Sequence, residues 1–453
     1  MRRLKSIILI AAALLPWAFA SAGCSGGSFK IPQYEDNVRM DIGLFDAPVN
    51  YFTAQSYFDD IAEAGCNYVI PVYHFSVANT RQLLLDRCRA AGLKAIFVDR
   101  NLVSVKNITA EAFNENDDVW DVSEIDKYID DPAFYGVHIM DEPLPEHFEY
   151  LKKKREQWNS SPLAQTDALF YVNLFPDCYD LFTTGISGKG TVDYKEYVRE
   201  FMDTVKPGIL SIDYYPIRQT AGQTYIWNNY FSCLDFAAHT AKEYNVPLKW
   251  IILTAGHGGA DGYKSNLTVE DLRWQMAVVM TYGVKNLTHY NYYPIESHYN
   301  AMITEKGRRT QLFDYVAEAN KEVLAWDHVF LNFNWQGTAA VTGSHGANNV
   351  MFDLIEDAMP VRLMNGIKSI ESSEDVLFGY FKDGKGNNGY MLTNAANPDD
   401  PYFPQVTVQF DKSYKGLRIY EKGLPRTVAL DKGKATISLD AGEGKFLIPL
   451  KTK

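Results

Sequence analysis

The sequence has 453 residues, of which 46% are hydrophobic and 14% are aromatic, and its formal net charge is −12. This length and composition fit a globular protein with one large domain and a smaller one. The acidic balance argues against a nucleic-acid-binding protein, because such proteins need a basic face.

The N-terminal segment has the pattern of an export signal. A basic start, "MRRLK", precedes the apolar run "SIILIAAALLPWAFA", and small residues precede Cys24. This order resembles a bacterial lipoprotein signal, which implies cleavage before Cys24 and a lipid on its thiol. Residues 1–23 would then be the signal peptide and residues 24–39 a flexible tether, which predicts a cell-envelope location on the periplasmic face or the outer-membrane surface. The alternative is an ordinary secretory signal cleaved near Ala22, and no later segment is apolar enough to span a bilayer.

Short apolar runs alternate with segments of helical periodicity between residues 40 and 330. The predicted strands are residues 40–47, 66–74, 93–101, 134–143, 168–176, 208–216, 249–258 and 284–294. The predicted helices between them include residues 53–65, 80–92, 193–205, 233–244 and 269–283. Eight such units predict an α/β fold in which residues 40–330 form a parallel (β/α)8 TIM barrel. A doubly wound open sheet is the alternative, but no glycine-rich nucleotide-binding loop follows the first strand.

The pattern changes to alternating strand segments after residue 330, with Gly, Asp and Asn turns between them. The predicted strands are residues 348–354, 375–381, 388–396, 405–410, 417–423, 435–440 and 445–450. They predict an antiparallel β-sandwich domain over residues 331–453.

Nearly every predicted barrel strand ends on a hydrogen-bonding side chain. In chain order these are Asp46, His74, Asp99, the pair Asp141 and Glu142, Asn173, Asp213, His257 and His289. In a TIM barrel these strand ends face the active site. Tyrosines after the sixth and eighth strands, including Tyr215 and Tyr293, suit stacking on a sugar ring. Because no basic cluster accompanies these groups, the pattern predicts a pocket for a neutral, hydroxyl-rich ligand.

The "MDEP" segment at the end of the fourth strand resembles the Asn-Glu-Pro motif of clan A glycoside hydrolases. The resemblance implies that Glu142 is the proton donor and that Asp141 stands where the family has an asparagine. The charge of Asp141 is expected to raise the pKa of Glu142, as a proton donor requires. Residues 273–294 and 301–323 are similar to family 42 β-galactosidase-like proteins, and residues 388–450 resemble the small β-domain of bacterial polysaccharide-degrading lipoproteins.

The resemblance breaks at the seventh strand, where clan A enzymes carry a glutamate nucleophile. Residues 249–258 contain no carboxylate, and the next one along the chain is Asp261. Hydrolysis of a glycoside normally needs two carboxyl groups. We therefore expect Asp213 to be the nucleophile or base, with Glu296 as the second candidate. A His257 base is a further hydrolytic alternative.

The sequence thus predicts a glycoside hydrolase of a polysaccharide-degrading bacterium, with Glu142 and Asp213 as catalytic residues, no cofactor, and the membrane reached only through the lipid. The expected substrate-binding residues are Asp141, Asn173, Tyr215, His257, Asn291, Tyr293 and Glu296. One alternative is a non-catalytic glycan-binding lipoprotein on a barrel scaffold, since a fold does not settle activity. The other is a metal enzyme, without a recognisable zinc motif, built on His74, His138, His257 and His289.

Overall fold

The structure is a computed structural model that describes residues 29–49, 51–72, 75, 78–98, 123–185, 190–257, 262–295, 298–345 and 350–453. The predicted signal peptide, Cys24 and the candidates His74, Asp99, Asp261 and Glu296 lie outside these residues, and for His257 only the backbone is described. Within the described ranges, no helix combines the length and the apolar character that a membrane crossing requires.

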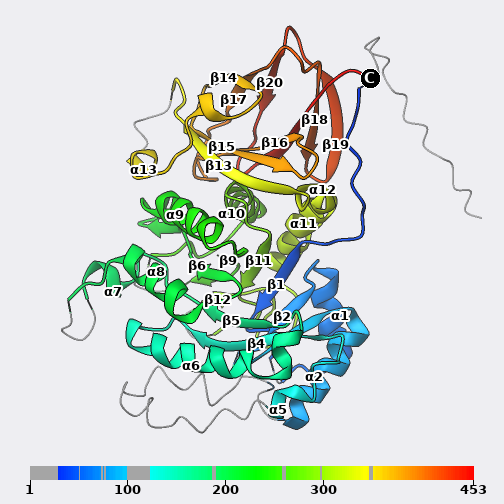
Figure 1. The fold of residues 1–453 in the computed structure, drawn as a ribbon, viewed down its shortest axis with the longest axis vertical. Coiled ribbons are helices and arrows are strands. Elements are labelled where there is room, and N and C mark those ends of the chain that lie inside the picture. Colours follow the sequence, from blue (N-terminus) through cyan, green and yellow to red (C-terminus); the bar gives the residue numbers. More distant parts are fainter. Residues whose placement is uncertain are drawn as a thin grey trace, which may run out of the picture.

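Eight parallel strands form a nearly closed barrel (Figure 1). The sheet order is β5-β4-β3-β2-β1-β11-β9-β6, and a parallel bridge between Leu174 and Ile212 joins the two ends of the sheet. The (β/α)8 prediction is therefore confirmed. The strands are β1 (Asp41–Phe45), β2 (Tyr68–Ile70), β3 (Lys94–Val98), β4 (Phe134–Asp141), β5 (Leu169–Asn173), β6 (Leu210–Asp213), β9 (Leu248–Leu253) and β11 (Asn286–Tyr290).

Helices surround the barrel, and local sequence explains where several of them begin. The Asp193 carboxylate accepts a hydrogen bond from the Glu196 amide at 2.9 Å, and Thr268 and Asp271 form a reciprocal capping box. The helices are α1 (Gln55–Glu63), α2 (Ala78–Ala91), α5 (Ser123–Asp126), η2 (Pro145–His147), α6 (Phe148–Asn159), η3 (Pro162–Gln165), α7 (Asp180–Thr183), α8 (Tyr194–Val205), α9 (Tyr230–Glu243), α10 (Val269–Thr281), α11 (Gln311–Leu324) and α12 (Asp327–Phe330).

Two short antiparallel pairs follow the sixth and seventh barrel strands. The first is β7 (Ile217–Thr220) with β8 (Gln223–Ile226), and the second is β10 (Gly256–His257) with β12 (His298–Asn300). Both pairs follow the C-terminal end of a barrel strand, so they lie on the side where a TIM barrel carries its site.

The C-terminal region contains two antiparallel sheets, as predicted. One has the order β13-β15-β16-β21-β18-β19 and the other β14-β17-β20. The expected strand at residues 348–354 is wrong, because Val350–Asp353 forms the short helix α13. The elements are β13 (Phe333–Val341), η4 (Val361–Leu363), β14 (Ile367–Ser372), β15 (Val376–Asp383), β16 (Asn388–Asn394), β17 (Gln405–Phe410), β18 (Gly416–Glu421), β19 (Leu424–Ala429), β20 (Lys434–Ser438) and β21 (Gly444–Leu450).

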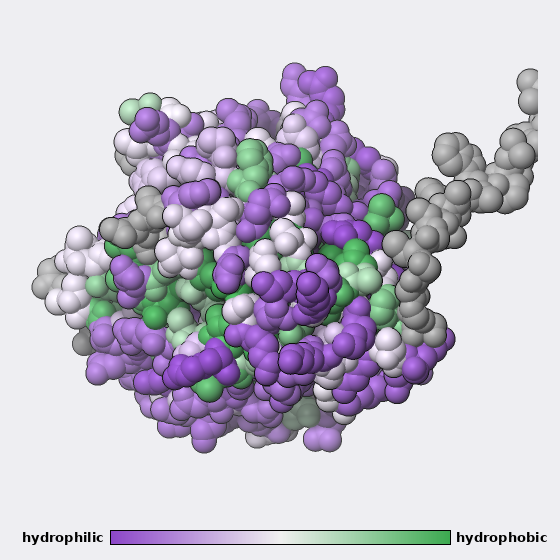
Figure 2. Space-filling view, turned by 90° about the horizontal axis from the view of Figure 1, so that it is seen from above, coloured by the Kyte–Doolittle hydropathy of each residue, from purple (hydrophilic) through white to green (hydrophobic). Residues whose placement is uncertain are grey.

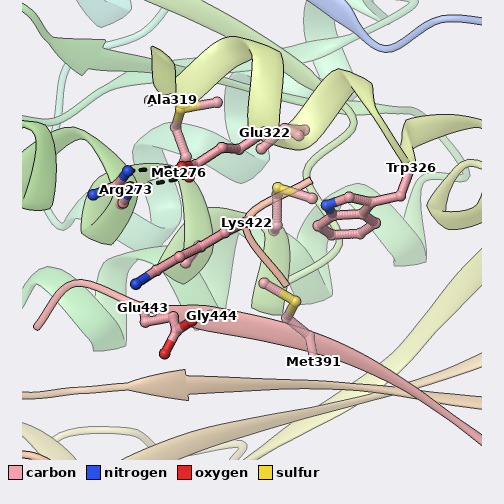
Figure 3. A pocket seen from close by; sticks show the side chains of 12 residues that line it. Arg273, Met276, Ala319, Glu322, Trp326, Met391, Lys422, Glu443 and Gly444 are labelled. Atoms are coloured by element: carbon pink, nitrogen blue, oxygen red, sulfur yellow. Dashed lines mark hydrogen bonds and ion pairs between the residues drawn. The ribbon is translucent and has the colours of Figure 1, made fainter. Parts of the chain in front are cut away.

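The β-domain, here the two sheets together, packs on α10, α11 and α12 of the barrel. Trp326 stacks on Phe446 with ring centroids 5.9 Å apart, and the hydroxyls of Thr281 and Thr393 lie 2.7 Å apart. Figure 3 shows the edge of this interface, where a small cavity of about 40 Å³ lies between side chains of both parts. Apolar burial therefore joins the β-domain to the barrel.

The end of the molecule formed by the β-domain is mainly hydrophilic. Figure 2 views the molecule from this end, and its hydrophobic residues lie in small separate areas. Scattered apolar side chains of this kind are normal on a protein surface.

Candidate active site

Three neighbouring strands bring carboxyl and amide groups together at their C-terminal ends. Asp141 ends β4, Asn173 ends β5 and Asp213 ends β6, and the register pairs Asp141 with Asn173. Glu142 follows β4, and its amide donates to the Asn173 carbonyl at 2.8 Å. The backbone of Glu142 is left-handed, with φ at 51°. Such conformations are uncommon outside glycine and concentrate at functional sites.

The Asn173 side chain connects the two aspartates. Its Nδ2 donates to Asp213 Oδ1 at 2.8 Å and lies 3.4 Å from Asp141 Oδ1. Its Oδ1 accepts from Ser211 Oγ at 2.9 Å, which orients the NH2 group toward the carboxyls. The side chains of Asn173 and Asp213, both predicted site residues, are therefore in direct contact.

Asp213 is buried beside other negative charges. Burial raises the pKa of its carboxyl well above the ordinary range, and the charges of Glu142 and Asp141 raise it further. Hydrogen bonds from Asn173 and Tyr215 act in the opposite direction. Carboxyls this close to one another do not all ionise together. The surroundings of Asp213 therefore favour its protonated form.

Aromatic rings form one side of the site. Tyr215, half-buried, stacks on Tyr290 with centroids 5.5 Å apart and planes 15° apart, and Phe45 lies 5.7 Å from Tyr290. Tyr215 had been predicted, but Tyr290 had not. The contact between Tyr215 and Tyr290 depends on how β6 and β11 lie in the barrel, so only the fold shows it.

Two further predicted sugar-binding residues, Asn291 and Tyr293, follow β11. Tyr293 is half-buried and contacts Phe52 and the exposed ring of Tyr51, at centroid distances of 6.0 and 6.2 Å. Asn291 is fully buried. Among the contacts of the described residues, none joins these two side chains to the carboxyl cluster.

The first strand contributes a further carboxyl group. Asp46 follows β1, is buried, and has a left-handed backbone with φ at 51°. Burial raises its pKa to about 7. The sequence indicated a polar end for this strand, but gave no sign of the altered pKa.

The two described histidine candidates do not meet. The His138 ring lies between Phe45 and Tyr171 inside the barrel, with centroids 5.8 and 4.9 Å away. The His289 ring bonds to Asn320 of α11 at 2.8 Å, and burial lowers its pKa to about 4. A metal centre shared by these two rings does not fit this arrangement.

The seventh barrel strand ends without an acidic side chain. In the described chain, β9 ends at Leu253 and is followed by Thr254, Ala255 and Gly256. The described residues at the end of the seventh strand are therefore apolar or neutral.

A buried lysine lies beneath the carboxyl cluster. Lys249 of β9 bonds to the hydroxyls of Tyr68 and Thr288, and its Nζ lies 5.1 Å from the centre of the Tyr171 ring. Burial lowers its pKa to about 7. The Tyr171 hydroxyl accepts from Ser211 at 3.2 Å, so a polar network runs from Lys249 up to the carboxyls. Sequence reasoning missed Lys249, although a lysine inside an apolar strand is a usable signal.

Comparison with solved structures identifies related folds. A catalytic mutant of a GH42 β-galactosidase from G. stearothermophilus matches with a TM-score of 0.51 and 10% identity, over 93% of this chain and 99% of that one. A Bacteroides fragilis protein described as a candidate α-galactosidase matches with a TM-score of 0.50 and 10% identity, over 92% and 80%. A β-galactosidase from Marinomonas ef1 matches with a TM-score of 0.44 and 11% identity over 64% of this chain, which spans 60% of that enzyme.

No protein-family sequence profile and no curated protein sequence matches the chain. At identities near 10% the structural matches establish the fold and not the chemistry. The chain therefore shares the fold of TIM-barrel glycoside hydrolases.

Proposed function

We propose that this protein is a glycoside hydrolase that cleaves a glycosidic bond of an oligo- or polysaccharide by carboxyl acid/base chemistry. The observation that carries the proposal is the cluster at the carboxyl end of the barrel, where Asn173 bonds to Asp213 and the charges of Glu142 and Asp141 act on the buried Asp213 carboxyl. The aromatic pair beside it offers a surface for a sugar ring. The shared fold supports the same class of reaction.

The two carboxyls take complementary roles in this proposal. Glu142 gives its proton to the departing glycosidic oxygen, and the Asp213 carboxylate attacks the anomeric carbon or removes a proton from the attacking water. The reaction therefore needs one proton on the pair and one negative charge. The surroundings of Asp213 favour its protonated form overall, so the proposal requires the proton of the pair to lie on Glu142 when substrate is bound. The hydrogen bonds from Asn173 and Tyr215 act in that direction.

The proposed sugar-binding residues surround this pair. Tyr215 supplies a ring, and Asp141 and Asn173 supply hydrogen-bonding groups within the cluster. The roles of His257, Asn291, Tyr293 and Glu296 in orienting the sugar stay predictions.

A lipid anchor is proposed for the N-terminus. Phe29 forms a bridge with Thr452 and the Lys30 amide donates to the Lys451 carbonyl at 2.9 Å, so the chain leaves from the β-domain. A lipid on Cys24 would then hold that domain close to a membrane of the cell envelope. Palmitate labelling in a bacterial host tests this, because Cys24→Ala should abolish the label if Cys24 carries the lipid.

A second candidate function is glycan binding without catalysis. The neutral end of β9 favours it, because clan A hydrolases carry their nucleophile there. Incubation with plant and host oligosaccharides, combined with calorimetric binding, separates the two. New reducing ends support the hydrolase, and saturable binding without product supports the binder. If the protein neither forms product nor binds an oligosaccharide, both functions are excluded.

A further inference from the structure

A small sheet made of loop segments stands beside Asp213. Strands β7 and β8 form a hairpin whose two turn residues, Ala221 and Gly222, both have positive φ. Residues 262–264 pair along β7, where the Gln219 amide donates to the Gly262 carbonyl at 2.5 Å. We call residues 217–226 and 262–264 the mouth sheet.

The mouth sheet supports the aromatic side of the site. The Arg218 guanidinium lies 3.5 Å from the centre of the Tyr263 ring and 4.7 Å from that of Trp227. The Tyr263 ring meets Tyr215 edge-on with centroids 6.0 Å apart. Because Tyr215 bonds to Asp213, the position of the mouth sheet bears on both the ring surface and a proposed catalytic carboxyl.

The β-domain fastens the mouth sheet. Asp399, in the loop between β16 and β17, accepts hydrogen bonds from Lys264 Nζ and from Thr224 Oγ1, both at 2.7 Å. Asn397 Nδ2 donates to the same threonine hydroxyl at 3.0 Å. The Asp399 carboxylate of the β-domain thus bonds both to the β7–β8 hairpin, through Thr224, and to the segment paired with it, through Lys264.

The ion pairs of Lys264 stabilise the contact between Asp399 and the mouth sheet. Lys264 is buried and also pairs with Asp271, at 2.8 Å, in the first turn of α10. Burial alone would raise the pKa of Asp399, yet the hydrogen bonds from Lys264 and Thr224 and the Lys264 charge hold that pKa below its ordinary value. Lys264 lies between the Asp271 and Asp399 carboxylates, so loss of the Asp399 contact would leave its buried charge with Asp271 alone.

We infer that Asp399 of the β-domain is a positioning residue that holds the mouth sheet against the sugar-binding side of the barrel. The effect on sugar binding rests on the proposed function, whereas the anchoring of the sheet does not. The β-domain then shapes the site although it contributes no group to the carboxyl cluster.

Asp399→Ala tests the inference, with Asp411→Ala as the matched control. Asp411 pairs with Lys368 at 3.1 Å within the β-domain and does not contact the mouth sheet. Hydrogen exchange of the amides at 217–226 and 262–264, measured without ligand, should become faster in Asp399→Ala only. The KM or Kd for a bound oligosaccharide should rise on the order of tenfold while kcat changes little.

These measurements test separately whether Asp399 anchors the mouth sheet and whether the mouth sheet affects sugar binding. Unchanged exchange in a folded Asp399→Ala protein would overturn the anchoring, and faster exchange with unchanged sugar affinity would overturn the link to the site. A wild-type protein that binds no sugar would defeat the proposed function, and the exchange data would still decide the anchoring. Thr224→Val, which removes one of the two contacts, provides the same test should Asp399→Ala not fold.

Discussion

Asp213 and Glu142 differ in their surroundings although they belong to one charged cluster. Asp213 is buried and holds a raised pKa, while Glu142 is half-buried and has a left-handed backbone at the end of β4. Carboxyls whose environments differ in this way can take separate acid and base roles. Their chemistry depends on the groups that set the charge of Asp213, and Asn173 is the most direct of these.

Asn173→Ala removes the amide that donates to Asp213. The pKa of Asp213 should rise further, so that less of it is ionised at neutral pH. A hydrogen bond to a charged group is worth about 1.5–3 kcal/mol, so kcat/KM near pH 7 should fall about tenfold to hundredfold. A pH–rate profile checks this, because activity should recover at higher pH. An equal loss at every pH would instead assign Asn173 to sugar binding.

Lys249→Met should change how stability depends on pH. The pKa of Lys249 is about 7 in the folded protein and about 10.4 in an unfolded chain. Between these values the unfolded chain binds more protons, so the stability linked to Lys249 is complete above pH ~10 and is lost as pH falls through about 7. The variant should lose this slope, worth on the order of a few kcal/mol. Urea unfolding across this range measures it, and identical slopes for both proteins would contradict the assignment.

Secondary-structure elements with a regular apolar pattern were predictable, and those without one were not. All eight barrel strands read as apolar runs, and so did β15 and β16, whose residues are almost all buried. The sequence missed β14 and β19, which bury few residues. It also missed β13, where a register shift between Trp335 and Gly337 interrupts the strand pairing. The apolar run at Val350–Asp353 predicts a strand but forms a helix, since so short a run fits either structure.

The site was predictable to the extent that it follows from strand order. Asn173 and Asp213 end neighbouring strands, so a parallel barrel brings them together. Tyr263 and Arg218 come from segments between the barrel strands. Their contact depends on an antiparallel bridge between these two residues, which the hydrophobic pattern of the sequence does not predict. Burial, which raises the pKa values of Asp46 and Asp213, becomes visible only in the folded chain.

The contact between α10 and β15 gives an element-scale prediction. A Cβ on Gly379 would strike the carbonyl oxygen of Thr281, which is backbone and cannot move aside freely. Gly379→Ala should therefore lower the free energy of unfolding by about 1–3 kcal/mol. Gly384→Ala is the control, because nothing lies within 4 Å of its Cβ position. Chemical denaturation that finds the two variants equally stable would contradict the tight packing of β15 on α10.

At the scale of the whole molecule, buried carboxyls set the pH dependence of stability. Burial is the main cause that raises the pKa values of Asp46, Asp177 and Asp235 to about 7 each. A raised carboxyl pKa contributes stability that is complete below pH ~4 and is lost as pH rises through about 7. The free energy of unfolding should thus be larger near pH ~5 than near pH ~7.5. Asp235→Asn should reduce the difference, and greater stability at the higher pH would refute the prediction.

The proposed hydrolase activity depends on a working carboxyl pair at the mouth of the barrel. The most direct measurement is kcat/KM for wild type, Glu142→Gln and Asp213→Asn on one oligosaccharide that the wild type hydrolyses, with binding measured in parallel. The account predicts that each variant binds the sugar while its kcat/KM falls by about 10²–10⁴-fold. Activity of either variant close to that of the wild type would contradict the assignment of Glu142 and Asp213 as the catalytic pair.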